Sequence, residues 1–253
     1  MQILQANAKM MLSPTEVAAK PLTIPAFQAE ADRLAKEMAR LNLDELAERL
    51  GCSRQLALEN QQRYQNFFLA EKVPAIMAYN GRAYQALKAP TLDAAALSFA
   101  QEHLFITCFL YGLLRPMDAI VPYRMEHTVR LEATNDKPID RFWRDKLTDY
   151  LIRAVQADDG ILIHLSTGEY ERLFDWGRVS HEVKVIKPLF YVRRQGQLRM
   201  QAVWAKAGRG AMVRHLLQVA ADQPAALADF AYEGFSYAPH LGEPAFPHFV
   251  REA

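Results

Sequence analysis

Apolar residues spaced three or four positions apart predict two amphipathic helices, because this spacing places them on one helical face. The first helix is marked by Phe27, Ala31, Leu34, Met38 and Leu41. The second is marked by Phe142, Trp143, Leu147, Tyr150, Leu151 and Ala154. Asp140 precedes the second set and is its predicted N-cap.

Shorter apolar runs predict strands. Met1–Gln5 reads as a first strand, Ala75–Tyr79 as a buried strand closed by Asn80-Gly81, and Ile161–Leu165 as a central strand. Ligands of α/β sheets gather at the carboxyl ends of strands. Lys9, after the first strand, and Ser166–Tyr170, after the central one, are therefore placed to face a site. For Lys9 alone, a solvated surface position is the competing interpretation.

The second half of the chain contains a predicted antiparallel hairpin. Glu182–Arg194 and Gln197–Ala205 flank Gln195-Gly196, and apolar and polar residues alternate along the latter segment. Phe230–Tyr237 is the predicted final strand.

Helix signals also cluster between residues 42 and 69. Asn42 followed by Glu45 is a capping-box pattern, Gly51 fits a helix C-cap, and Ser53 fits the next N-cap. Two helices joined in this way resemble a helix-hairpin-helix unit, which binds the DNA backbone through its turn and nearby arginines. A simple packing unit is the alternative interpretation.

In the stretch Phe109–Leu131, the apolar residues follow neither the spacing of a helix nor the alternation of a strand. A helical region over Ala94–Leu114, interrupted near His103, is expected to end where Arg115-Pro116 and Val121-Pro122 restrict the backbone. The loop that follows carries charged and tyrosine side chains, which form either a buried ion-pair network or a binding site. These residues are Arg115, Asp118, Tyr123, Arg124 and Glu126.

Composition limits the function classes. The chain has 51% hydrophobic and 23% charged residues, which is ordinary for a globular protein. Its net charge is +1 and its pI is near 7.8, so it lacks the excess of positive charge that marks a strongly basic nucleic-acid binder. Any phosphate-binding surface is therefore a local patch. The two cysteines, Cys52 and Cys108, form neither a disulfide framework nor a metal motif. With no membrane span or signal segment recognised, a cytoplasmic location is expected.

Lys206–Gly210 is the strongest phosphate-binding signal. Two glycines near a predicted helix start permit close backbone approach, and Lys206 and Arg209 share one helical side with Arg214 nearby. A solvated basic face is the alternative. His164 alternates with apolar neighbours and is predicted to be structural. No catalytic motif, cofactor or metal site is predicted.

Taken together, these motifs resemble one family, that of the bacterial peroxide-stress protein YaaA and its relatives, over nearly the whole chain. The matching residues are Ala8-Lys9, Tyr79-x-Gly81-x-x-Tyr84, Leu110-Tyr111-Gly112-x-Leu114-Arg115-Pro116-x-Asp118, Pro122-Tyr123-Arg124-x-Glu126, Glu169-Tyr170, Lys187-Pro188, Ala205-Lys206-x-x-Arg209-Gly210-x-Met212-x-Arg214 and Glu233-Gly234-Phe235. The chain departs from the family pattern at Ala6-Asn7, at Thr128, and at Ala207-Gly208, where a lysine of the phosphate patch is lost.

The resemblance implies a single compact domain of mixed α/β (α+β) class over residues 1–253, with a central mixed sheet flanked by helices. It also implies a helix-hairpin-like element at 42–69, a role in peroxide resistance through limited iron and DNA damage, and binding of duplex or branched DNA in a basic cleft. The cleft residues would be Lys9, Arg115, Arg124, Lys206, Arg209 and Arg214, with Tyr79, Tyr84 and Tyr123 beside them. Asp118, Glu126 and Glu169 would orient the cations. The alternative function is an enzyme acting on a small anionic or phosphorylated substrate in the same cleft.

Overall fold

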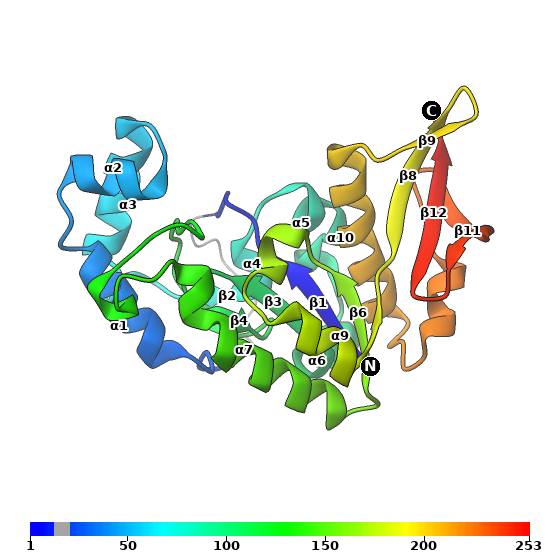
Figure 1. The fold of residues 1–253 in the computed structure, drawn as a ribbon, viewed down its shortest axis with the longest axis horizontal. Coiled ribbons are helices and arrows are strands. Elements are labelled where there is room, and N and C mark those ends of the chain that lie inside the picture. Colours follow the sequence, from blue (N-terminus) through cyan, green and yellow to red (C-terminus); the bar gives the residue numbers. More distant parts are fainter. Residues whose placement is uncertain (13–20) are drawn as a thin grey trace.

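The computed structural model describes residues 1–12 and 21–253 of the chain. It is a single mixed α/β domain in which two five-stranded sheets flank one long helix, α10 (Ala202–Gln218) (Figure 1). Among the helices of the described ranges, none is long and apolar enough to cross a membrane.

The first sheet has β1 at its centre and the order β4-β3-β1-β6-β7. β1 pairs in parallel with β3 and β6, β6 pairs in parallel with β7, and β4 turns back antiparallel to β3. Parallel strands that are buried on both faces read as continuous apolar runs, which explains why the first and central strands were predictable. The strands are β1 (Gln2–Ala6), β3 (Leu104–Cys108), β4 (Gly112–Leu114), β6 (Ile161–Leu165) and β7 (Lys184–Ile186).

The second sheet has the order β10-β11-β12-β8-β9 and is antiparallel except where β12 pairs with β8. Gln195 and Gly196 both have positive φ angles, 51° and 75°, and form the predicted hairpin turn between β8 and β9. A further short pair joins β2 (Val73–Pro74) to β5 (Ala119–Ile120). The strands are β8 (Leu189–Arg194), β9 (Gln197–Arg199), β10 (Ala231–Tyr232), β11 (Phe235–Glu243) and β12 (Phe246–Glu252).

Helices cover the first sheet and extend away from it. α10 contacts β1 and β6 of the first sheet and β8 of the second, whereas α7 contacts β4 and β6. The α-helices are α1 (Gln28–Met38), α2 (Leu43–Leu50), α3 (Arg54–Gln65), α4 (Ala75–Ala78), α5 (Arg82–Leu87), α6 (Ala94–His103), α7 (Ile139–Gln156), α8 (Gly168–Glu171), α9 (Trp176–Glu182) and α10. Short 3₁₀ turns lie at Ala89–Thr91, Glu132–Thr134 and Pro224–Asp229.

The pair α2 and α3 projects from one end of the molecule (Figure 1). Its capping is as predicted: the Asn42 side chain accepts from Glu45 N–H while the Glu45 carboxylate accepts from Asn42 N–H, Gly51 is left-handed, and Ser53 caps α3. The DNA-binding role of this unit stays a prediction.

Two predicted elements are wrong in type. Ala75–Tyr79 is not a strand, because Ala75–Ala78 forms α4 directly after Pro74, and short apolar runs do not separate a strand from a buried helix. The segment Ile106–Leu114 is not helical: it forms β3 and β4, where β3 lies beside β1 and the positive φ of Gly112, 72°, turns the chain back.

Other boundaries also differ from the predictions. The predicted strand Glu182–Arg194 is divided at Lys187-Pro188 into β7 of the first sheet and β8 of the second, and Glu182 is the last residue of α9. The alternating segment after Gln197 ends at Arg199, and the alanine-rich stretch from Ala202 continues as α10. α7 begins after Pro138, so Asp140 lies in its first turn and is not its cap. The predicted final strand, Phe230–Tyr237, is divided by a turn at Glu233-Gly234 into β10 and the start of β11, and β12 follows as one more strand.

Candidate functional site

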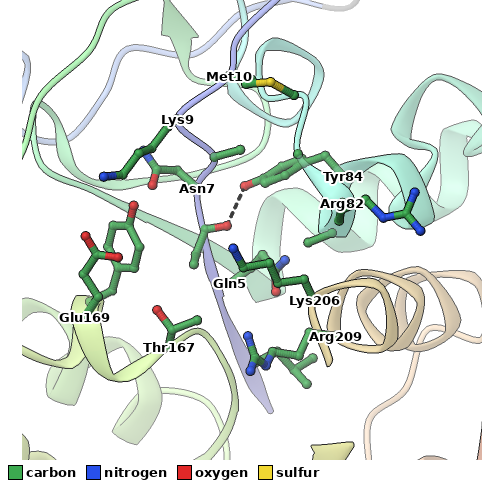
Figure 2. A pocket seen from close by; sticks show the side chains of 16 residues that line it. Gln5, Asn7, Lys9, Met10, Arg82, Tyr84, Thr167, Glu169, Lys206 and Arg209 are labelled. Atoms are coloured by element: carbon green, nitrogen blue, oxygen red, sulfur yellow. Dashed lines mark hydrogen bonds between the residues drawn. The ribbon is translucent and has the colours of Figure 1, made fainter. Parts of the chain in front are cut away.

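A pocket of about 290 Å³ opens where β1 and β6 end. Gln5 and Ala6 close β1, and Leu165 and Thr167 come from the end of β6. The other walls are residues 7–10, the start of α5, the short α8 and two side chains of α10 (Figure 2). This edge of the sheet is the one predicted from the strand ends.

α10 contributes Lys206 and Arg209, which lie one helical turn apart and line the same wall. Lys206 is exposed and Arg209 is partly buried. Within residues 1–12 and 21–253, the Arg209 guanidinium has no carboxylate partner and makes no hydrogen bond. Burial lowers the pKa of Arg209, yet arginine stays charged at neutral pH. The charged guanidinium of Arg209 is therefore available to bind an anion.

The glycines of this stretch serve helix packing. α10 already begins at Ala202, so residues 206–210 lie beyond its first turn and their N–H groups are not free, which corrects the predicted phosphate loop. A Cβ on Gly208 would lie 2.4 Å from Cδ1 of Phe190, and one on Gly210 would lie 1.8 Å from the carbonyl oxygen of Ala83. Close contact with β8 and α5 therefore requires both glycines.

Lys9 and Arg124 both bind the carboxylate of Glu126. Lys9 Nζ lies 2.7 Å from Glu126 Oε2, and Arg124 Nη2 lies 2.7 Å from Glu126 Oε1. Glu126 is 9% exposed. Lys9 lines the pocket, whereas Arg124 lies behind Glu126 and does not. The charge of Arg124 is therefore compensated inside the protein.

Three tyrosines hold the end of β1. The Tyr79 and Tyr123 hydroxyls are 3.0 Å apart, Asn7 Nδ2 donates to the Tyr123 hydroxyl at 3.2 Å, and the Tyr84 hydroxyl donates to the Ala6 carbonyl at 3.1 Å. All three rings are buried, and burial raises each tyrosine pKa well above its ordinary value. Tyr84 alone of the three lines the pocket. Cys108 lies beside the Tyr79 and Tyr123 hydroxyls, and burial raises the pKa of its thiol to about 11.

Arg115 and Asp118 lie at the opposite edge of the sheet. Arg115 Nη1 donates to Gln2 Oε1 at 3.1 Å and to the Leu104 carbonyl at 3.3 Å, at the beginnings of β1 and β3. Its guanidinium stacks 3.5 Å from the centre of the Phe105 ring, and burial lowers its pKa to about 10. Asp118 accepts from the Arg115 N–H at 2.7 Å, and burial raises the pKa of this carboxyl group. These two residues stabilise the loop between β4 and β5 and do not line the pocket.

Arg214 is also separate from the pocket. Its Nη1 donates to the carbonyls of Leu87 and Lys88 and to the Thr91 hydroxyl, at 2.8–3.2 Å. The side chain thereby satisfies carbonyls at the end of α5. Of the twelve predicted side chains, the structure gathers Lys9, Tyr84, Glu169, Lys206 and Arg209 around one space.

Several pocket residues were not predicted, among them Gln5, Asn7 and Arg82, whereas Thr167 belongs to the segment expected after the central strand. Gln5 is 2% exposed, and its Oε1 and the Oδ1 of Asn7 are buried without a hydrogen-bond donor in the described structure. The sequence signal for Gln5 was its place as a polar residue in an otherwise apolar strand, because a buried polar side chain needs a hydrogen-bond partner.

Behind the pocket, His164 of β6 contacts Glu171 of α8. His164 Nε2 donates to Glu171 Oε1 at 2.7 Å, and Lys187 Nζ donates to the same oxygen at 2.6 Å. Burial lowers the pKa of His164, so its ring is neutral at pH 7. The hydrogen bond from His164, followed by that from Lys187, lowers the pKa of Glu171 to about 2.

The pocket is electropositive. Arg82, Lys206 and Arg209 line it without a carboxylate partner in the described ranges, Lys9 shares Glu126 with Arg124, and Glu169 is the pocket's own carboxylate. Such a surface favours an anionic ligand. No cluster of three or more metal-ligand side chains occurs in the part of the chain that the structure describes.

Comparison with known proteins gives one consistent family. The family described as peroxide stress protein YaaA matches residues 1–241. A UPF0246 protein of Bacteroides thetaiotaomicron is 37% identical over 245 residues, which cover 96% of this chain and 95% of the relative. A UPF0246 protein of Porphyromonas gingivalis is 38% identical over 233 residues, or 91% of each chain. One of Ruegeria pomeroyi is 36% identical over 236 residues, covering 90% of this chain and 91% of the relative.

Proposed function

Because the chain belongs to the family of the peroxide stress protein YaaA, we propose that it acts in the peroxide stress response by binding duplex or branched DNA. The observation that carries this proposal is the convergence of Lys206 and Arg209 on one pocket without compensating carboxylates among the described residues, with Arg82 exposed on the outer side of the same wall (Figure 2). Cations that neutralise phosphates supply most of the sequence-independent affinity for DNA.

The proposed contact is smaller than the cleft expected from the sequence. Arg115 and Arg214 are bound to other parts of the protein, and Arg124 is bound to Glu126. Lys206 and Arg82 are exposed at the rim and reach backbone phosphates, whereas Arg209 lies deeper. Few phosphates are neutralised at once, so the affinity for DNA is modest and sensitive to salt.

The test measures the affinity for duplex and four-way-junction DNA by fluorescence anisotropy between about 50 and 200 mM salt. The double variant Lys206→Gln/Arg209→Gln should weaken binding and reduce the slope of log K against log salt by about 0.9 for each lost phosphate contact. The charge-matched control Lys137→Gln/Arg199→Gln removes two exposed cations outside the pocket and should leave the slope unchanged. Flat salt dependence in the wild type, or equal binding by the pocket variant, would contradict the proposal.

We also propose that the protein limits intracellular iron and DNA damage during peroxide stress, on the basis of family membership. Cells lacking the protein should contain more loosely bound iron, measured by electron paramagnetic resonance of chelated iron, and more strand breaks after peroxide. If the Lys206→Gln/Arg209→Gln variant restores normal iron and strand-break levels in these cells, the role in iron limitation does not depend on the pocket.

A second candidate function is an enzyme that acts on a small anionic substrate. The size of the pocket favours it, because about 290 Å³ admits a small molecule and not a duplex. Glu169 is the carboxylate that lines the pocket, and it has no ion-pair partner among the described residues, so it is the proposed general acid or base. Glu126, in contrast, is bound by two cations. Turnover of phosphorylated compounds that is lost in Glu169→Gln but not in Glu132→Gln would support this function.

A further inference from the structure

We propose that the pocket receives a terminal phosphate monoester on a sugar, as found in a nucleoside 5′-monophosphate or at the 5′ end of a DNA strand. This inference rests on the proposed function, because it names the part of a phosphorylated ligand that enters the pocket. It follows from the cations of one wall, from unpaired acceptors beside them, and from the size of the space.

The phosphate is assigned to Arg209 and Lys206. Arg209 is the partly buried cation, and within the described residues nothing on the protein hydrogen-bonds its guanidinium. Lys206 lies one turn earlier on α10 and faces the same space (Figure 2). A planar guanidinium beside an ammonium suits the oxygens of a phosphate dianion.

The sugar is assigned to the amide side chains at the end of β1 and directly after it. The amide nitrogen of Asn7 donates to the Tyr123 hydroxyl, which leaves Asn7 Oδ1 without a donor, and the buried Gln5 Oε1 lacks one as well. Buried acceptors are normally satisfied. Both oxygens are covered by protein, so a sugar hydroxyl or a base amino group donates to them once the amide side chains rotate toward the pocket, whereas inorganic phosphate or a simple carboxylate brings few donors. Glu169, which lies with Lys9 across the pocket from Arg209 (Figure 2), adds a further acceptor.

The size of the pocket favours a terminal group over an internal phosphate. A volume of about 290 Å³ lies at the lower end of small-molecule sites. A phosphodiester inside a strand carries a nucleotide on each side and a single negative charge. A monoester has one substituent and a second charge, so it fits both the space and the two cations. The free nucleotide and the strand end share this chemistry.

Isothermal titration calorimetry of the full chain with AMP, adenosine and inorganic phosphate tests the site. AMP should bind at least tenfold more tightly than either of the other two probes. Arg209→Gln should weaken AMP binding by about 10- to 100-fold, the effect of losing charge-assisted hydrogen bonds, with partial rescue in Arg209→Lys. Arg199→Gln, on β9, is the matched control and should bind as the wild type does. If Arg209→Gln fails to fold, Lys206→Gln, an exposed position, replaces it.

A second arm compares a 5′-phosphorylated duplex, the same duplex with 5′-hydroxyl ends, and closed circular DNA. Tighter binding of the phosphorylated duplex, with displacement by AMP, identifies the strand end as the source. AMP binding that depends on Arg209 without any DNA binding supports the free nucleotide and refutes the DNA proposal alone. AMP that binds no better than inorganic phosphate overturns the inference. Equal binding of all three DNAs, together with AMP that binds no better than inorganic phosphate, overturns the inference and leaves the DNA proposal standing.

Discussion

The arginines that the sequence singled out have different surroundings, and these decide what each can bind. Arg115 lies on an aromatic ring and binds Gln2, Arg124 binds Glu126, and Arg214 binds carbonyls of the α5 end. Arg209 alone of these four lacks a partner in the described structure. All four are arginines within segments that resemble the family, so the sequence identified the candidates but could not rank them.

At the same scale, the predicted site residues lie together where a motif follows a parallel strand. Lys9 and Glu169 come shortly after β1 and β6, and the topology of parallel strands brings them together. Arg115 follows β4, which is antiparallel, so its side chain lies at the other edge of the sheet. The direction of β4 depends on the Gly112 turn, which the helical interpretation of this stretch did not include.

Glu171 gives the first residue-scale prediction. Its pKa in the folded protein is about 2, below the ordinary value of 4.5. A carboxylate with a lowered folded pKa stabilises the protein above its unfolded pKa, and this stability is lost as the pH falls through the folded pKa. At pH 7, Glu171→Gln should therefore lower the free energy of unfolding by about 1 kcal/mol, since the ion pair is partly exposed. The difference from the wild type should shrink between pH 4.5 and about 2.

Urea unfolding of both proteins at several pH values measures this difference. Glu182→Gln, which removes a carboxylate from a surface pair with Arg178, serves as the control and should have little effect at any pH. A Glu171→Gln difference that stays constant from pH 7 to pH 2.5 would show that His164 and Lys187 do not stabilise the ionised carboxylate.

At the scale of elements, the approach of α10 to α5 is the tightest constraint on a helix position. Gly210→Ala adds a methyl group that would lie 1.8 Å from a backbone oxygen of Ala83, and backbone cannot rotate away. We expect this substitution to lower the free energy of unfolding by about 1–3 kcal/mol through overpacking, although alanine is the better helix former by about 1 kcal/mol.

Gly177→Ala is the matched helix control for this measurement. Gly177 lies in α9, is exposed, and a Cβ there would come no closer than 3.4 Å to its neighbours. This substitution should be neutral or stabilising in thermal unfolding. Equal effects of the two substitutions would mean that α10 and α5 can separate without cost.

Element prediction from the sequence succeeded where a long pattern repeats and failed for short apolar runs. α1 and α7 each bury one face of several turns, and α2 has a complete set of caps, so local chemistry determines them. Ala75–Ala78 and Leu104–Cys108 are both short and buried, and their secondary structure depends on neighbours. β3 is a strand because β1 pairs with it across about a hundred residues of sequence, and no local signal encodes that partner.

At the scale of the whole molecule, α10 joins the two sheets into one body. It contacts β1, β6 and α5 on one side and packs Gly208 against Phe190 of β8 on the other (Figure 1). A shared helix of this kind couples the stability of both halves. We therefore expect one cooperative unfolding transition for the full chain.

The variant Trp143→Phe/Trp176→Phe tests this expectation, because its remaining tryptophan, Trp204, packs against Phe235 and Arg251 of the second sheet. Its fluorescence should report unfolding at the same urea concentration as far-ultraviolet circular dichroism, which follows the helices of the whole chain. A fluorescence change that precedes the loss of helix would show that the second sheet unfolds independently.

The position of β12 between β11 and β8 also sets an order for folding during synthesis. All strands of the first sheet have been made once the chain reaches Ile186, but the pocket also needs Arg209 of α10. The second sheet cannot close until residues 246–252 leave the ribosome, because β8 has its parallel partner only there. Domains fold as units while the chain emerges at about 5–20 residues per second. During this interval the apolar face of β8 depends on α10 for cover, so the helix that carries the anion-binding side chains also protects the nascent protein.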